Sequence, residues 1–342
     1  MTTAKKQGVF RLSLIGCGAH ALDYLCPPLS KLPEVEFVAC CDVDEGRTAQ
    51  AMRSFDFQRP YLDYNTMLAK EDLHGVVIAM PHSRLAGAAV AALRAGRNVF
   101  IEKPMAASPA EAREMRDAAK KSGASLMVGY CERFAEGRRI MKRLISEGAI
   151  GDIVNVNAAK GSPPLLTGWQ SDPAMGGGPI RWVGSHVTDQ VLWMVGSEPE
   201  RVTADIAWRP KGGVEQDVSY TIRFKNGVLA SFLCSQQVGA VDFVEVFGTK
   251  GRVRAEWPPE YSTIPGDTVT VQSAVVPAYA NPTTIVPGAP HPSNMYAAEL
   301  KEWLASLKER RPPAVTIEDG NAVVTILDAV YRSARSGSPV TL

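Results

Sequence analysis

Residues 9–21 read VFRLSLIGCGAHA, and this stretch decides the fold. An apolar run typical of a buried strand, Val9–Ile15, leads directly into a Gly-x-Gly-x-x-Ala sequence at 16–21. In a strand-turn-helix unit, the first glycine allows a tight turn and the second lets the backbone approach a pyrophosphate. The helix N-terminus that follows favours bound anions. The stretch therefore predicts a dinucleotide-binding turn whose cofactor contacts are made by Gly16, Gly18, Ala19 and His20.

Outward from this stretch, apolar runs alternate with helical patterns up to about residue 129. The further strand candidates are Phe37–Cys41, Val76–Met80, Val99–Ile101 and Ser125–Val128. Apolar residues recur at about 3.6-residue spacing in three helix candidates, which are Arg47–Ser54, Ser83–Ala95 and Pro109–Ser122. Such an alternation predicts a parallel sheet with helices on both faces. Pro27-Pro28 must end or kink the first helix early, because proline lacks the N–H that a helix interior needs.

The second predicted strand ends at Asp42, which lies 24 residues after Gly18. An acid at about this distance typically bonds the ribose hydroxyls of the adenosine half of the cofactor. Because its carboxylate would repel a 2′-phosphate, NAD is favoured over NADP. Two alternatives stay open. A loop acid could instead cap the next helix, a role that suits Asp44 better, and Arg47 could bind a phosphate, although we expect it on that helix.

After about Tyr130 the pattern changes. A helix at Glu136–Glu147 and a strand at Ile153–Ala159 precede a Gly/Pro-rich loop at 161–179 and a helix at Val183–Met194. Strands without intervening helices follow at Val202–Trp208, Val218–Phe224, Val228–Cys234, Phe243–Phe247 and Arg252–Ala255. Consecutive strands, with an Asn226-Gly227 hairpin signal, predict a largely antiparallel sheet.

The chain is longer than one hydrophobic core usually serves, so two domains are expected. We place a Rossmann dinucleotide-binding domain at residues 1–129 and an α+β domain with a largely antiparallel open sheet at 130–342. Within the second domain, residues 257–292 carry many prolines and little periodicity, which indicates a long connection. Helices at Tyr296–Lys308 and Ile317–Ser336 follow it.

Composition and charge exclude several classes of protein. Lys and Arg number 37 against 36 Asp and Glu, which argues against a dedicated nucleic-acid binder or a polybasic membrane protein. No apolar run approaches the roughly 20 residues that span a bilayer. The six cysteines and five histidines lack metal-ligand spacing, so no metal site is expected. Reduced thiols, and the lack of an apolar signal core in residues 1–8, predict a cytoplasmic protein.

Further motifs extend over nearly the whole chain. They are Glu102-Lys103-Pro104, Gly129-Tyr130, Arg133-Phe134, Gly148-x-x-Gly151, Trp169, Gly176–Gly178, Gly184-x-His186-x-x-Asp189, Glu318–Gly320 and Tyr331–Ala334. Together with the turn at 16–21, they resemble the glucose-fructose oxidoreductase / inositol dehydrogenase / MocA family. The resemblance implies NAD(P)-dependent hydride transfer to or from a hydroxyl or keto group of a sugar, cyclitol or related small molecule. It also implies a second domain whose open sheet forms oligomer contacts, hence a homodimer or homotetramer.

Lys103 and His186 are the catalytic candidates. Lys103 follows a strand at the C-terminal edge of the parallel sheet, where open α/β sheets bind ligands, so its ammonium could stabilise a developing alkoxide. His186 is a candidate because an unperturbed imidazole titrates near neutrality, as a general base should, and Asp189 shares its helix face. The alternatives are a solvated surface lysine and a structural histidine. The residues expected to complete the cofactor site are Pro81, His82 and Glu102.

One position departs from the family pattern. The family commonly has Asp four residues before the histidine, where this sequence has Trp182. Since positions four apart share a helix face, the ring is expected in the same cleft as His186. Three consequences are open: a substrate with fewer hydroxyls or with an aromatic ring, another acid taking over, or lost catalysis. The candidate acids are Asp172, Asp189 and Glu132.

The residues expected to contact substrate are Arg133, Trp169, Trp182 and Asp189. Trp169 could stack on a sugar ring or simply pack. Positive charge from Arg133, Arg181 and Lys160 would suit a carboxylated or phosphorylated substrate, unless these side chains are solvated at the surface. Two rival functions remain: a non-catalytic sensor that binds NAD and regulates protein partners, and a lyase or glycosidase that uses tightly held NAD for a transient oxidation.

Overall fold

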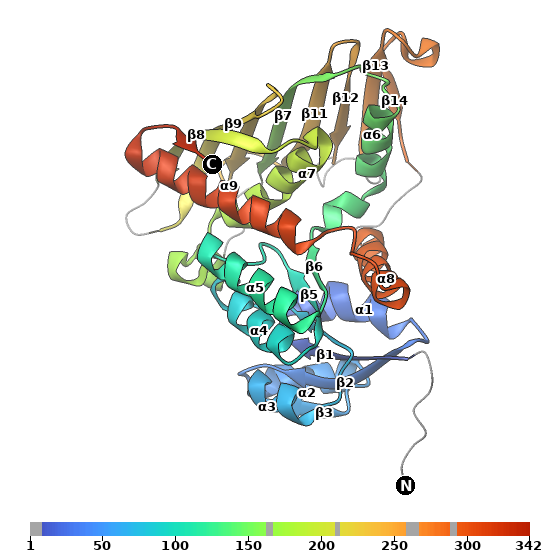
Figure 1. The fold of residues 1–342 in the computed structure, drawn as a ribbon, viewed down its shortest axis with the longest axis vertical. Helices are drawn as coiled ribbons and strands as arrows, with labels where there is room; N and C mark the ends of the chain where they lie inside the picture. The colour runs from blue at the N-terminus through green and yellow to red at the C-terminus, as the bar shows by residue number, and fades with distance from the viewer. Residues whose placement is uncertain (1–8, 162–166, 209–212, 258–266, 288–292) are drawn as a thin grey trace. The chain divides into compact units, whose positions relative to one another are not determined.

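The structure is a computed structural model, and it describes residues 9–161, 167–208, 213–257, 267–287 and 293–342 (Figure 1). The chain divides into two compact units. The first comprises Met1–Gly129 with Tyr296–Asn321, and the second comprises Tyr130–Met295 with Ala322–Leu342. Parts of the predicted loop at 161–179 and of the predicted connection at 257–292 lie outside the described residues.

A six-stranded parallel sheet forms the centre of the first unit. Its strands are β1 (Phe10–Ile15), β2 (Val35–Cys41), β3 (Arg59–Tyr61), β4 (Gly75–Ile78), β5 (Asn98–Glu102) and β6 (Leu126–Gly129). They lie in the order β3-β2-β1-β4-β5-β6, which is the strand order of the Rossmann fold. The predicted parallel sheet is confirmed. The three-residue edge strand β3 was not predicted, because so short a run has no readable alternation.

Three of the four helices between β2 and β6 have a side-chain cap at their N-terminus, and α4 does not. The four are α2 (Glu45–Ser54), α3 (Tyr64–Lys70), α4 (His82–Arg94) and α5 (Pro109–Ser122). The side chains of Asp44, Asp63 and Ser108 accept hydrogen bonds from first-turn N–H groups of α2, α3 and α5. Asp44 therefore caps α2, and Asp42 is left to another role.

The chain after the Gly-x-Gly turn forms a π-helical turn, Ala21–Leu25, and a short helix α1, Cys26–Ser30. Pro27 and Pro28 lie in the first turn of α1, where a missing N–H does not cost a helical hydrogen bond. The helix therefore continues past the proline pair and ends at Ser30.

Helix α8 (Ser293–Glu309) returns the chain to the first unit. Trp303 is fully buried there, with its ring 5.7 Å from that of Phe100. A Cβ at Gly75 would come within 3.1 Å of the Trp303 ring, so this glycine leaves room for the indole. Residues 296–321 thus belong with the first unit and not with the segment 130–342 in which we had placed them, because a large apolar side chain of α8 fills that core.

A nine-stranded sheet forms the second unit. Its strands are β7 (Ile153–Gly161), β8 (Pro199–Trp208), β9 (Glu215–Phe224), β10 (Leu229–Ser235), β11 (Val241–Gly248), β12 (Gly251–Glu256), β13 (Thr268–Ser273), β14 (Thr283–Ile285) and β15 (Val340–Thr341). They lie in the order β14-β13-β12-β11-β7-β10-β9-β8-β15. The β7–β10 pair is parallel and the others are antiparallel, which confirms the largely antiparallel sheet.

Two of these strands correct a prediction. The segment 257–292, predicted as a connection, contains β13 and β14 among its described residues. Val269 and Val271 of β13 are fully buried, and Thr268, Thr270 and Gln272, which alternate with them, are partly exposed. The proline content around this run hid the alternation typical of a strand.

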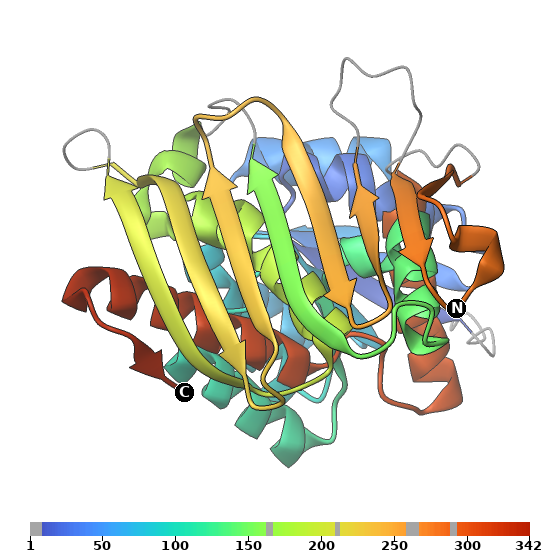
Figure 2. The same ribbon diagram turned by 90° about the horizontal axis from the view of Figure 1, so that it is seen from above.

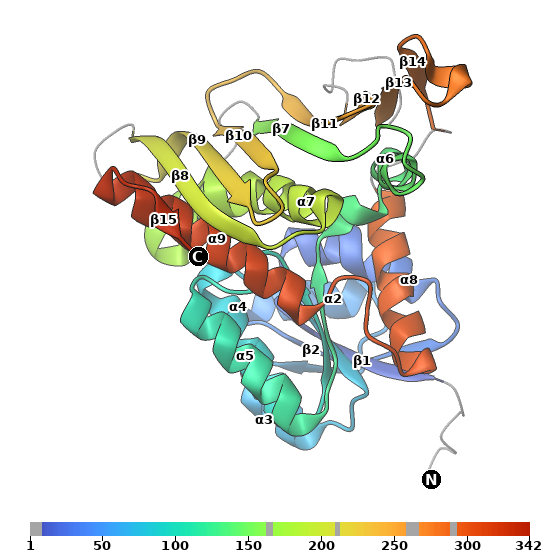
Figure 3. The ribbon, with the colours of Figure 1, turned by 45° about the horizontal axis from the view of Figure 1, so that its top comes forward.

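Three helices cover one face of this sheet, and Figures 2 and 3 show them together on that side. They are α6 (Glu136–Ser146), α7 (Ser185–Val195) and α9 (Ile317–Ser336). The covered face is apolar, with Tyr220, Ile222 and Phe224 of β9 buried, whereas Ser219, Thr221 and Arg223 alternate with them and are exposed. No helix in the described part of the chain has the length and apolar character to cross a membrane.

Candidate active site

Gly16 is required by the protein itself. It ends β1 with a φ of +92°, and its N–H donates to the carbonyl oxygen of Cys41 at 2.8 Å. A Cβ built on Gly16 would lie 2.1 Å from the carbonyl oxygen of Ala79, a distance that no side chain tolerates. The tight turn that the sequence predicts therefore leaves no room for another residue here.

Gly18 is a different case. A Cβ on Gly18 would meet no protein atom within 4 Å, and its φ is not in the positive range. Neither packing nor backbone conformation explains a glycine at position 18. The reason for it therefore lies outside the chain, in a ligand that the backbone approaches closely. This fits a pyrophosphate on the turn, and Ala19 beside it is exposed.

Asp42 lies at the carboxyl end of β2 and is tied to the turn. Its Oδ2 accepts from the N–H of Cys17 at 2.8 Å, and its Oδ1 accepts from the N–H of Asp44 at 3.1 Å. Arg47 on α2 reaches Oδ2 at 3.9 Å with a side chain that is 57% exposed. The carboxylate is therefore fixed beside the Gly-rich turn, as a ribose ligand would be.

The Glu-Lys-Pro segment meets the Gly-rich turn. Nε2 of His20 lies 2.9 Å from Oε1 of Glu102, and Oε2 of Glu102 accepts from the N–H of Lys103 at 3.2 Å. Burial raises the pKa of Glu102, but the positive charges of His20 and Lys103 outweigh it and leave the pKa below its ordinary value. The Lys103-Pro104 peptide is cis, which the sequence had left open.

The predicted cofactor residues of the first unit share one edge of its sheet. β1, β4 and β5 are adjacent and parallel, so their carboxyl ends lie side by side. Gly16 follows β1, Pro81 and the buried His82 follow β4, and Lys103 follows β5. Open α/β sheets bind their ligands at this edge.

Glu299 is a carboxyl group near this edge that we did not predict. It lies on α8, is fully buried, and neither of its side-chain oxygens has a hydrogen-bond partner. Burial, and the negative charge of neighbouring Glu102, raise the pKa of Glu299 well above its ordinary value. The surroundings of Glu299 therefore favour its protonated form. A single glutamate in an amphipathic helix gives no signal of this in the sequence.

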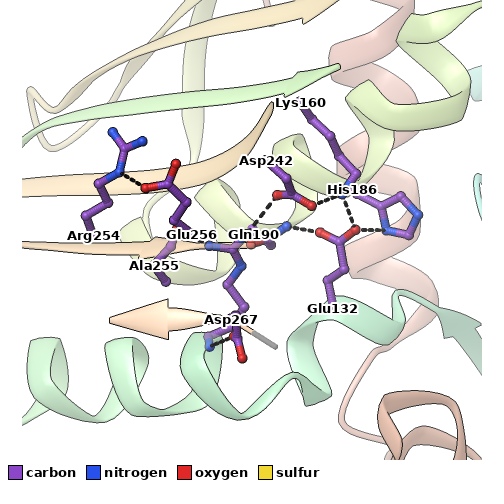
Figure 4. A network of polar contacts seen from close by, with 10 residues as sticks. Glu132, Lys160, His186, Gln190, Asp242, Arg254, Ala255, Glu256 and Asp267 are labelled. Atoms are coloured by element: carbon purple, nitrogen blue, oxygen red, sulfur yellow. Dashed lines mark hydrogen bonds and ion pairs between the residues drawn. The ribbon is translucent and has the colours of Figure 1, made fainter. Parts of the chain in front are cut away.

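His186 of the second unit belongs to a buried polar network (Figure 4). Its Nδ1 lies 3.5 Å from Oε1 of Glu132, which follows β6 in a 3-10 turn, Cys131–Phe134. The same Oε1 is 2.7 Å from Nζ of Lys160 on β7, and Oε2 accepts from the amide of Gln190 on α7. The sequence had offered Glu132 as one of three acids that could serve the site.

Lys160 is fully compensated by acids. Besides Glu132, its ammonium pairs with Asp242 on β11, and the other oxygen of Asp242 accepts from Arg138 at 2.7 Å. Burial alone would lower the pKa of Lys160, but Asp242 and Glu132 raise it well above its ordinary value. The lysine is thus a permanent cation inside the network and not a solvated surface charge.

Arg133 and Asp189 pair with each other. Nε and Nη2 of Arg133 donate to the two oxygens of Asp189 at 2.8 and 2.6 Å, and both side chains are buried. Asp189 is one of the acids that the sequence offers for the site, and the contact of both residues with substrate stays a prediction. The bidentate geometry pairs the two side chains with each other, and Glu132 is the acid for which the structure shows an ion pair with His186.

Trp182 and Trp169 form an aromatic pair. Their ring centroids are 5.9 Å apart at 67°, an edge-to-face arrangement. Trp182 lies in a π-helical turn, Ile180–Gly184, that leads into α7. The ring of His186, in contrast, contacts that of Tyr130 at 6.3 Å. The two residues four apart therefore have different aromatic neighbours.

Glu215 anchors the loop that precedes the turn Ile180–Gly184. This residue was not identified in the sequence analysis. Its Oε1 accepts from the N–H of Ile180 at 3.1 Å and from the hydroxyl of Tyr331 at 2.8 Å. A Cβ on Gly178, whose φ is +109°, would lie 2.4 Å from Glu215. The glycine at position 178 thus allows the backbone to pack against the buried carboxyl group of Glu215.

Comparisons with known proteins agree with this arrangement. A family model described as "Oxidoreductase family, NAD-binding Rossmann fold" matches residues 10–130, and one described as "GFO/IDH/MocA C-terminal domain" matches residues 139–254. The chain is 30% identical to 1,5-anhydro-D-fructose reductase of Ensifer adhaerens over 96% of this chain and 97% of that protein. It is 26% identical to D-xylose 1-dehydrogenase (NADP(+)) 2 of Haloferax volcanii, over 92% and 94%.

Among solved structures, the chain is similar to a levoglucosan dehydrogenase in complex with NADH and levoglucosan. The TM-score is 0.86 at 25% identity, and the match covers 97% of this chain and 99% of that one. The fold and its cofactor turn define an NAD(P)-dependent oxidoreductase. The chain belongs to the Gfo/Idh/MocA family of oxidoreductases, as the sequence motifs had indicated.

Proposed function

We propose that the protein transfers a hydride between NAD and a ring hydroxyl or keto group of an uncharged sugar, cyclitol or related small molecule. The observation that carries this is the shared sheet edge of the first unit, where the Gly-rich turn and Lys103 follow parallel strands on either side of β4. A cofactor turn and a lysine at one edge suit the oxidation of an alcohol.

The chain's own residues would divide the chemistry as follows. Gly18 and the α1 side of the turn hold the pyrophosphate, and Asp42 accepts from the adenosine ribose. Bound NAD supplies the acceptor for the hydride that leaves the carbinol carbon. Lys103 donates a hydrogen bond to the reacting oxygen and stabilises the alkoxide, and His186 takes the hydroxyl proton. Lys103 and His186 belong to different units, and their action on one substrate is part of the proposal.

NAD is the proposed cofactor, with NADP as the alternative. A carboxylate held as rigidly as that of Asp42 would lie where a 2′-phosphate must go and would repel it. Arg47 supports the alternative, because its exposed guanidinium lies beside the same carboxylate. The relatives include an NADP(+) enzyme and an NADH complex, so the proposed preference for NAD rests on the chain's own Asp42 and Arg47.

An uncharged substrate is supported by the partners of the basic residues. Arg133 is committed to Asp189, and Lys160 to Glu132 and Asp242. Arg181 lies over the ring of Tyr331 at 4.9 Å. Their charges are neutralised or engaged by protein groups, so a carboxylated or phosphorylated substrate has little to bind here. The Trp169–Trp182 pair instead offers an apolar wall for the face of a ring.

A homodimer or homotetramer in the cytoplasm completes the proposal. One face of the nine-stranded sheet has no helix over it within the described residues, and Leu229 and Leu233 of β10 are exposed. The six cysteines are buried and none is in a disulfide, which suits a reducing compartment. Light scattering on the purified protein tests the oligomer.

The test of the function is NADH formation across a panel of aldoses, cyclitols and anhydro-sugars, with wild type and Lys103→Ala compared on the substrate found. We expect kcat of Lys103→Ala to fall more than about tenfold, or about 1.4 kcal/mol. Lys120→Ala, at an exposed position of α5, should leave kcat unchanged. A smaller loss in Lys103→Ala would show that Lys103 does not stabilise the alkoxide. NAD binding without NADH formation on any substrate would favour the sensor, and cofactor that copurifies and shows no net turnover would favour the lyase or glycosidase.

A further inference from the structure

The position that carries an acid in the family pattern holds Trp182 in this chain, yet His186 has a carboxylate beside it. The acid is Glu132, from the 3-10 turn after β6, with Oε1 3.5 Å from Nδ1 of His186 (Figure 4). The two side chains are each about nine-tenths buried, so they interact in a medium less polarisable than water.

We propose that Glu132 is the positioning carboxylate of His186, in a chain that has Trp182 where the family pattern has an Asp. The proposal rests on the proposed function, in which His186 accepts the hydroxyl proton. A carboxylate at Nδ1 selects the tautomer that has its proton on Nδ1. Nε2 then carries the lone pair that faces the substrate proton, and Glu132 stabilises the imidazolium that forms.

Two neighbouring side chains hold Glu132 in place. Oε2 accepts from the amide of Gln190, one helical turn after His186 on α7. The ammonium of Lys160 lies 2.7 Å from Oε1, the same oxygen that faces His186. Because this oxygen is shared with a permanent cation, the proton stays on the imidazole and does not pass to Glu132.

The other charged groups around His186 are engaged elsewhere. On α7 itself, Asp189 is bound in a bidentate pair by Arg133, the residue after Glu132. On β11, Asp242 lies between Lys160 and Arg138. Of the acids that the sequence offered, Asp172 is exposed and accepts from the N–H of Ala174. Glu132 is the acid for which the structure shows an ion pair with His186.

The decisive variant is Glu132→Gln, which keeps the size of the side chain and removes its charge. We expect kcat to fall about tenfold or more, with KM changed less than about threefold. The acid limb of the pH profile of kcat/KM should move to lower pH by about one unit, since an imidazolium without its carboxylate loses its proton more easily. Glu132→Asp retains the charge, so it should keep the position of the limb and recover part of kcat.

Glu147→Gln is the matched control, because Glu147 is an exposed acid after α6 that pairs only loosely, at 4.0 Å, with Arg143. It should change neither kcat nor the pH profile. A fall in kcat with an unmoved acid limb in Glu132→Gln, and no recovery in Glu132→Asp, would show a merely structural Glu132 and overturn the proposal.

A second readout separates this inference from the proposed function. The imidazole of His186 can be followed by nitrogen NMR in the intact protein without substrate. We expect the Nδ1–H tautomer and a titration midpoint that is higher in wild type than in Glu132→Gln. An unchanged tautomer and midpoint would overturn the role of Glu132 even in an active enzyme. If the tautomer and midpoint differ as expected but the protein turns over no substrate, the role of Glu132 is supported. Only the oxidoreductase mechanism is then contradicted.

Discussion

Nε2 of His20 lies 2.9 Å from Oε1 of Glu102, and this contact joins the cofactor turn after β1 to the Glu-Lys-Pro segment after β5. Both side chains belong to the first unit, and Glu102 also accepts from the N–H of Lys103. One carboxylate thereby positions a residue of the turn and the backbone of the proposed catalytic lysine.

Replacing this carboxylate with its amide tests the link. In Glu102→Gln the side chain keeps its size but loses the charge that attracts His20, so the turn becomes less ordered. We expect the Kd of NAD, measured by calorimetry, to rise about fivefold to tenfold, as for a charged hydrogen bond of 1–1.5 kcal/mol. Asp72→Asn, an exposed acid paired with Arg11 in the same unit, should leave it unchanged. Equal affinities in the two variants would show that the contact does not shape the turn.

The two glycines of the turn should respond in opposite ways to alanine. Gly18→Ala meets no protein atom, so the Tm should stay within about 2 °C while the Kd of NAD rises at least about tenfold. Gly16→Ala should lower the Tm strongly or abolish soluble folding, because its Cβ would overlap the carbonyl of Ala79. A Gly18→Ala protein that binds NAD as tightly as wild type would remove the pyrophosphate from this turn.

The cofactor preference should depend on the charge of Asp42. Asp42→Asn keeps an oxygen for the N–H of Cys17 but no longer repels a 2′-phosphate. The exposed Arg47, which keeps Asp44 as an ion-pair partner at 3.9 Å, could then attract a 2′-phosphate. We expect the ratio of kcat/KM for NAD to that for NADP to fall about tenfold or more. In the double variant with Arg47→Ala, the gain in NADP use should be lost. A ratio that does not move would place the determinant of the preference elsewhere.

Buried Glu299 should make stability depend on pH. Its pKa is raised in the folded state, so folding favours its protonated form and this contribution is lost as pH rises from about 4.5 towards the raised pKa. Glu299→Gln, which cannot ionise, should therefore gain in Tm relative to wild type between pH 5 and pH 8.

Glu302, one turn later on α8, should give stability the opposite dependence on pH. Its hydrogen bonds with Arg311 lower its pKa, so its contribution is present above about pH 4.5 and is lost as pH falls. Glu302→Gln should be less stable than wild type at pH 7, by an amount that shrinks towards pH 4. If both variants followed one pH trend in thermal melts, the two environments would not differ as described.

Trp182 should affect ring substrates more than open-chain ones. Trp182→Ala removes one of the two rings of the edge-to-face pair with Trp169, and an aromatic contact of this kind contributes about 1 kcal/mol. We expect KM for a cyclic substrate to rise about fivefold, with a smaller change for an acyclic polyol of the same length. Trp208→Ala, at an exposed indole that ends β8, is the control. Equal effects on both substrate types would remove the apolar wall from the proposal.

Local patterns predicted the parts of the fold that are formed by neighbouring residues. The strands and helices of the first unit follow apolar spacing and caps such as Ser108, and Gly16 follows from the turn geometry. The sequence could not show that α8 packs in the first unit, because Trp303 and Phe100 meet across a long stretch of chain. For the same reason Glu132, Glu215 and Glu299 were missed or left as alternatives: only the folded chain shows which acid lies beside which base.

The return of α8 to the first unit has a consequence for the order in which the protein can fold during synthesis. Trp303, which fills the core beside Phe100, is made only after residues 130–295 have been synthesised. At ordinary rates of translation this delay is on the order of ten seconds. Until α8 has been synthesised, the apolar surface of the nascent Rossmann sheet that Trp303 covers is exposed to chaperones and proteases.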